Sequence, residues 1–165
     1  MRIIRTLAIG VLLVGTAESA RAQLGRQQGL VEPNVSDDTT LMKLPNMSAA
    51  TVEALKGARP LLSIVTVDSI LDTKGVTKPQ RSELYGKMFV HVDLNRAPDA
   101  ELLLIPGVDA NKVRMIKAGR PWTSFETFRT EFGKVTSPAE AARVEQYVFI
   151  PIELNTFTEA TMDSF

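Results

Sequence analysis

The sequence predicts a mainly α-helical protein built from two full tandem repeats and a partial third, joined by short extended connectors. Three observations predict this fold class. The 165 residues are 44% apolar, enough to bury the core of one domain or of two small ones. A segment of about sixty residues recurs along the chain. Within each copy, short apolar runs with helical spacing alternate with turn residues.

Composition excludes several classes of function. The chain has no cysteine, so disulfides, thiolate metal sites and a cysteine nucleophile are excluded. Its one histidine, His91, leaves little scope for a histidine-built metal centre. No nucleophile elbow, glycine-rich phosphate loop or His/Asp metal cluster occurs. We therefore expect no enzyme activity, no cofactor and no metal.

Residues 1–22 are predicted to be a secretory signal peptide. Arg2 and Arg5 precede an apolar run from Leu7 to Val14, and the stretch ends at Ala20-Arg21-Ala22. An uncleaved membrane anchor is the alternative, but the run is shorter than the roughly 20 residues of a spanning helix. We expect cleavage near Ala22/Gln23, a periplasmic or secreted protein, and no stable membrane insertion afterwards. The mature chain then has 16 basic and 18 acidic residues, a formal net charge of −2.

The repeat divides the rest of the chain. Residues 23–30 are predicted to be a flexible tail. When Val31 is aligned with Val92, Asn34 matches Asn95, Leu44-Pro45 matches Ile105-Pro106, and Arg59-Pro60 matches Arg120-Pro121. The first unit is therefore residues 31–91 and the second unit residues 92–152. Residues 153–165 match only the opening of a unit and form a truncated third unit or cap.

In the second unit the elements are expected in the following order. Pro98–Ile105 is a short helix, because proline and acidic residues suit a first helical turn. Pro106-Gly107 breaks the chain, and Asp109 or Ala110 begins a helix that runs to about Ala118, with Val113 and Ile116 on its buried face. Gly119-Arg120-Pro121 ends that helix.

The remaining elements follow the same rules. Phe125, Phe128 and Phe132 recur at helical spacing, which predicts a helix with a core face. A last helix is expected over Pro138–Tyr147. The apolar residues of Val90-His91-Val92-Asp93-Leu94 and of Ile150-Pro151-Ile152 alternate, as in an extended connector with one buried face.

The second unit resembles a known family. From Asp93-Leu94-Asn95 through Ile105-Pro106-Gly107-Val108 to Arg120-Pro121-Trp122, the order of features is similar to the tandem helix-hairpin-helix domain of secreted ComEA-type competence proteins. The resemblance covers residues 92–148 closely, residues 31–89 more loosely, and residues 153–165 only in their opening. It implies a SAM-like helical bundle of tandem helix-hairpin-helix repeats.

The resemblance also implies a function, sequence-independent binding of DNA as in the uptake of external DNA. In such a hairpin, backbone N–H groups at a glycine turn near a helix N-terminus bind phosphate oxygens, and basic residues of the next helix add attraction. The implied phosphate-binding residues are Pro106, Gly107, Val108, Lys112, Arg114 and Lys117. Two weaker hairpins, around Gly75 and Lys78 and around Gly133 and Lys134, are secondary candidates.

The chain departs from the family pattern at two hairpins. Asp109 stands where the family has a second glycine. The first unit has Pro45-Asn46-Met47-Ser48, with no glycine, and Thr51 and Glu53 replace Lys112 and Arg114. Asn46 can adopt the left-handed conformation, but we expect no polyanion binding by this degenerate first unit.

A second class of function stays open, a protein-interaction or assembly module that uses the same fold without binding DNA. The net charge of −2 and the degenerate first hairpin favour it, since DNA-binding proteins are usually basic. The tail offers Leu154, Phe157, Met162 and Phe165 as an apolar set. We expect it to cap the second unit, or alternatively to exchange between two chains and form a homodimer.

Overall fold

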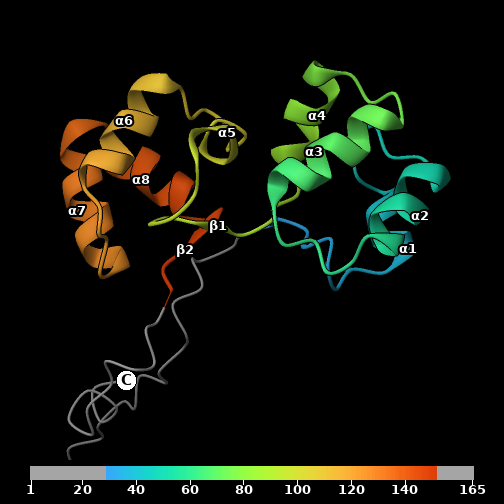
Figure 1. Ribbon diagram of the computed structural model, residues 1–165, viewed down its shortest axis with the longest axis horizontal. Helices are drawn as coiled ribbons and strands as arrows, with labels where there is room; N and C mark the ends of the chain where they lie inside the picture. The colour runs from blue at the N-terminus through green and yellow to red at the C-terminus, as the bar shows by residue number, and fades with distance from the viewer. Residues whose placement is uncertain (1–28, 152–165) are drawn as a thin grey trace, which may run out of the picture.

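The computed structural model describes residues 29–151 (Figure 1). The predicted signal peptide, most of the predicted tail 23–30 and the truncated third unit lie outside these residues. Within the described part the chain forms eight helices and two strands of two residues each. The prediction of a mainly α-helical protein is therefore confirmed.

The helices form two groups of four, shown in Figure 1 as α1–α4 and α5–α8. In the first group the bounds are α1 Asp38–Met42, α2 Ala49–Gly57, α3 Ile64–Thr73 and α4 Lys78–Tyr85. In the second they are α5 Asp99–Leu102, α6 Ala110–Ala118, α7 Phe125–Val135 and α8 Pro138–Glu145. The strands are β1 Val92–Asp93 and β2 Val148–Phe149.

Each helix of the first group has a counterpart in the second. The first residues of α1, α2 and α3 align with those of α5, α6 and α7 in the register of the sequence repeat, whereas α8 begins one residue earlier than that register places it. The change arises because α7 is one residue longer than α3 while its loop to α8 is two residues shorter. The predicted ends of α6 are confirmed. Helices α5 and α8 are shorter than predicted, because Leu104 and Ile105, like Gln146 and Tyr147, donate their N–H groups to i−3 carbonyls.

Local signals explain where most of these helices begin. A serine or aspartate precedes them, and its side chain accepts a hydrogen bond from an N–H group of the first turn. The N-cap residues of this kind are Asp37, Ser48, Ser63, Asp109, Ser124 and Ser137. Helix α4 is instead capped by Gln80, whose Oε1 accepts the N–H of Thr77 at 2.8 Å. The start of most helices is therefore set by a single polar N-cap residue.

The recurring asparagine and arginine each bind backbone in the same way in both units. Asn34 accepts the N–H of Leu61 at 2.7 Å and donates to its carbonyl at 3.1 Å. Asn95 makes the same two bonds to Trp122, at 2.7 and 2.9 Å. Arg59 donates to the Ser36 carbonyl at 2.7 Å, and Arg120 donates to the Ala97 carbonyl at 2.8 Å. These bonds tie the opening of each unit to the segment that follows its second helix.

The connector between the units is extended and half-buried, as predicted. Val90, Val92 and Leu94 are buried, and the residues between them are less so. Val92 pairs with Val148 in a parallel ladder, and an isolated parallel bridge joins Val31 to Met88. These pairings close each unit by bringing its end beside its beginning, which the apolar alternation alone did not predict.

The core runs through both units. Buried residues of the two helix groups form one continuous apolar cluster, including Leu55, Leu84, Leu102 and Phe128. Trp122 is 4% exposed and donates its Nε1 hydrogen to the Ile116 carbonyl at 2.8 Å, so it packs on the helices. A further contact links the units directly, since the hydroxyl of Ser63 donates to Glu101 Oε1 at 2.5 Å.

One turn differs from its prediction. The sequence predicts Gly133 in the second hairpin turn of the second unit, but it lies inside α7, and the chain turns at Thr136 and Ser137. A Cβ built on Gly133 would lie 3.6 Å from Pro138 and 3.8 Å from Ala141, which are ordinary van der Waals distances, so the packing of α7 on α8 does not require glycine there.

Candidate functional site

The turn between α5 and α6 has the conformation expected of an anion-binding turn. Gly107 has φ +72°, the left-handed region that favours glycine. Val108 is buried, and Asp109 caps α6 by accepting the N–H of Lys112 at 2.9 Å. Pro106 is half-buried and Gly107 is exposed. The turn is therefore exposed at Gly107, and Asp109 serves as the N-cap of α6.

The three predicted basic residues of α6 have different surroundings. Lys112 reaches back to the turn, where its Nζ donates to the Gly107 carbonyl at 2.6 Å and pairs with Glu140 at 2.5 Å. Lys117 pairs with Asp99 at 2.5 Å and, by donating that hydrogen bond, lowers the pKa of the carboxyl group. Arg114 is exposed and bonds the Asn111 side chain. Of the three, Lys112 alone is hydrogen-bonded to the turn.

A cation that sequence reasoning missed lies against the same turn. A Cβ built on Gly107 would lie 2.8 Å from Arg143 Nη2 and 3.0 Å from Arg143 Cζ, so the α8 guanidinium lies against one side of the glycine. The Nη1 of Arg143 is buried and has no hydrogen-bond partner among the described residues. A comparison of the two repeats could have identified this cation, because Arg143 of α8 stands at the position of Glu83 of α4 and has the opposite charge.

Glu140 holds both cations. Its carboxylate accepts hydrogen bonds from Arg143 Nη2 at 2.6 Å and Nε at 3.0 Å, in addition to the Lys112 pair. These bonds, first from Arg143 and then from Lys112, lower the pKa of Glu140 to about 2 despite its partial burial. Glu140 is therefore ionised at neutral pH.

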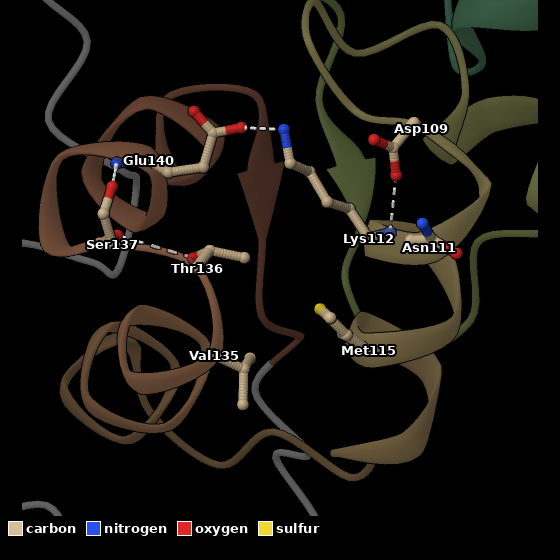
Figure 2. A pocket seen from close by; sticks show the side chains of 8 residues that line it. All are labelled: Asp109, Asn111, Lys112, Met115, Val135, Thr136, Ser137 and Glu140. Carbon is tan, nitrogen blue, oxygen red and sulfur yellow. Dashed lines mark hydrogen bonds and ion pairs between the residues drawn. The ribbon is translucent and has the colours of Figure 1, made fainter.

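A pocket of about 340 Å³ opens beside this ion cluster, between the start of α6 and the turn from α7 to α8 (Figure 2). Figure 2 shows the Lys112 ammonium reaching across to the Glu140 carboxylate, while Met115 and Val135 lie at the other end. The lining residues are Asp109, Asn111, Lys112, Met115, Val135, Thr136, Ser137 and Glu140.

The corresponding turn of the first unit has the same backbone and the opposite charge. Asn46 stands at the position of Gly107 and has φ +61°, a left-handed conformation that asparagine can adopt. Its amide donates to Glu83 Oε2 at 2.9 Å, so a carboxylate stands where Arg143 stands in the second unit. Thr51, in the place of Lys112, bonds the Ser48 side chain. No cation lies at these three positions of the first unit.

The residues of the two secondary hairpins differ in their placement. Gly75 has φ +78° in the turn before α4, where Lys78 is exposed. In the second unit Gly133 is helical, and Lys134 forms an exposed pair with Glu131 at 2.8 Å. The first of these sites is a turn with a nearby cation, and the second is a solvated helix face.

Neither a membrane-spanning helix nor a cluster of three or more potential metal ligands occurs within residues 29–151. No protein-family model, no curated protein and no solved structure matches this chain. Its function is therefore inferred from its own residues and their geometry.

Proposed function

We propose that this chain is an exported tandem helix-hairpin-helix protein of the ComEA type that binds DNA through backbone phosphates, without reading sequence. The second unit carries the site, with Pro106, Gly107 and Val108 in the turn and Lys112, Arg114 and Lys117 on α6. The order of motifs along residues 92–148 supports the family. Four helices per unit, three of which begin in the register of the sequence repeat, support the tandem arrangement.

One observation carries the proposal: a left-handed glycine turn at the start of a capped helix, with Lys112 in contact with the same glycine. Such a turn can offer N–H groups to a phosphate oxygen, the helix dipole favours negative charge, and a lysine adds attraction. The N–H of Val108 is already used within the turn, since it donates to the Ile105 carbonyl at 3.0 Å. Contacts of these groups with phosphates would carry no sequence information, so the binding would depend on salt rather than on sequence.

The site is local, because the charge of the unit is balanced. Residues 92–152 contain eight basic and eight acidic side chains. Attraction would then come from short-range contacts at the turn, together with the exposed Arg114 and Lys117, and not from a long-range positive field. We accordingly expect modest affinity at physiological salt.

The first experiment is a titration of residues 23–165 into fluorescent duplex DNA at about 50 and about 200 mM salt. Steep weakening with salt is expected. A K112E/R114E/K117E variant and Gly107→Asp should each weaken binding by about tenfold or more at low salt.

The matched control is K43E/K56E/K87E, which reverses three charges in the first unit. Its Lys56 pairs with Asp38 at 2.7 Å, as Lys117 pairs with Asp99 in the second unit. Equal losses in the two triple variants would contradict a site in the second unit. Absence of binding at about 50 mM salt by folded protein would overturn the DNA proposal.

A specific observation favours the second candidate, a protein-interaction module. Leu62 is 82% exposed and Leu103 is 48% exposed, and in the sequence they lie one residue before Ser63 and two residues after Glu101, which are hydrogen-bonded across the units. Exposed leucines of both units near one contact suit a protein partner or a homodimer. Sedimentation of the same protein tests the homodimer, which should be lost in Leu62→Ser/Leu103→Ser.

A further inference from the structure

Two cations from different helices converge on one carboxylate beside the Gly107 turn. Lys112 comes from α6 and Arg143 from α8, and Glu140 pairs with them at 2.5 and 2.6 Å. All three side chains are partly buried, at 25%, 31% and 22% exposure. The carboxylate oxygens of Glu140 therefore occupy the position that a bound phosphate oxygen would take between these cations.

The cluster has unused capacity for an anion. The Arg143 guanidinium has five N–H donors, and Glu140 engages only Nε and Nη2. Its Nη1 is buried without a partner in the described part of the chain. The other acidic neighbour of Lys112 is Asp109, whose carboxylate accepts the backbone N–H of Lys112. Glu140 is thus the carboxylate that pairs with both cations, whereas the Asp109 carboxylate caps α6 beside the same turn.

The first unit shows that this ion cluster is not needed for the fold. There, Thr51, Gln80 and Glu83 stand at the positions of Lys112, Glu140 and Arg143. Helices α2 and α4 nevertheless span the same number of residues as α6 and α8. Because the same elements form without the cluster, its charges are available for another role.

We propose that Glu140 is an internal competitor for the anion site, and that a nucleic-acid phosphate displaces it from Lys112 and Arg143. The inference rests on the proposed function and adds Arg143 to the phosphate-binding residues. It makes Glu140 the residue that limits affinity. Lowering the pH to 5 would not release the cations, because Glu140 remains ionised there.

The decisive variant is Glu140→Gln, with Glu131→Gln as its matched control. Each removes one negative charge from a glutamate of the second unit that is paired with a lysine. Glu140→Gln should tighten duplex DNA binding at about 50 mM salt by about fivefold, the size of one ion pair. Glu131→Gln should change it by less than twofold. Arg143→Gln should weaken binding in both the wild-type and the Glu140→Gln background.

The outcomes separate this inference from the proposed function. If the wild type binds DNA and Glu140→Gln, with a wild-type circular dichroism spectrum, binds no more tightly, the inference is wrong and the proposed function stands. If the wild type does not bind DNA, the proposed function fails, and calorimetric titration with tripolyphosphate decides the inference. Tighter tripolyphosphate binding by Glu140→Gln than by Glu131→Gln supports it, and equal binding overturns it.

Discussion

Gly119 is predicted to be the position where the smallest added side chain has the largest effect on stability. A Cβ there would lie 2.1 Å from Trp122 Cζ2 and 2.3 Å from Cη2. The backbone itself accepts alanine, since Gly119 has φ −85°. Gly119→Ala is therefore a purely steric perturbation of one buried ring.

The size of the effect follows from how the ring is held. To reach an ordinary contact of 3.4 Å, the ring must move by roughly 1.3 Å. Such a shift breaks the 2.8 Å bond from Nε1 to Ile116 and disturbs the edge-to-face contact with Phe128. Overpacking costs about 1–3 kcal/mol and the lost hydrogen bond about 1 kcal/mol, so we expect a loss of about 2–4 kcal/mol.

The assay uses the fact that Trp122 is the only tryptophan of the chain. Urea unfolding followed by its fluorescence should show a lower midpoint for Gly119→Ala and a red-shifted native emission, because the ring becomes less buried. An unfolding free energy within about 0.5 kcal/mol of the wild type, the range of an ordinary surface substitution, would refute the steric reasoning.

The first unit supplies the compensating change. Ala58 and Leu61 stand at the positions of Gly119 and Trp122, so a methyl group is present where the facing side chain is smaller. Gly119→Ala/Trp122→Leu, measured by circular dichroism, should lose at least about 1 kcal/mol less than the sum of the single variants. Additive losses would show that the two positions do not interact.

Further predictions concern turns, buried charge and pH. Gly107→Ala should lower the unfolding free energy by about 1–2 kcal/mol because of its positive φ, and by more because the Arg143 guanidinium lies against the added Cβ. Gly75→Ala should lower it only by the amount due to the positive φ, because nothing is found within 4 Å of its added Cβ. Urea unfolding midpoints of the two variants compare these effects. Arg81→Met should lower the unfolding free energy by about 3 kcal/mol, since the buried guanidinium donates to two carboxylates and a backbone carbonyl. Asp72→Asn changes a carboxylate that is 70% exposed and should lower it by less than about 1 kcal/mol. Equal losses in that pair would contradict the dependence on burial. The lowered pKa of Glu140, about 2, means that its ion pairs stabilise the folded chain fully above pH 4.5 and less as the pH falls toward 2. The difference in unfolding free energy between the wild type and Glu140→Gln should shrink over that interval, and a constant difference would contradict the shift.

Local signals made much of the second unit predictable from its sequence. Asp109 accepts the hydrogen bond that begins α6, and Gly119-Arg120-Pro121 ends it where expected. The positive φ of Gly107, and the left-handed conformation available to Asn46, follow from residue type alone. Each of these features depends on a few neighbouring residues, which is why the sequence predicts them.

Features that depend on distant residues were not predictable in this way. Gly133 lies inside α7, which packs against α8, and its neighbours in sequence do not indicate this. Arg143 and Glu140 reach the Gly107 turn from α8, at the far end of the same unit. Alignment of α4 with α8 would have identified the reversal from Glu83 to Arg143.

The residues that recur between the units and those that differ have separate roles. Both polar atoms of the Asn95 amide bind the backbone of Trp122, and Asn34 is used likewise in the first unit. The recurring asparagine and the recurring Arg-Pro pair therefore tie the opening of each unit to the segment that follows its second helix. The α5–α6 turn has Gly107 beside Arg143, and its counterpart before α2 has Asn46 beside Glu83. Both turns have a positive φ, so the charge beside them can change while the backbone conformation is kept. Ligand binding is therefore best sought where the two units differ in charge, and the second unit carries the cations at those positions.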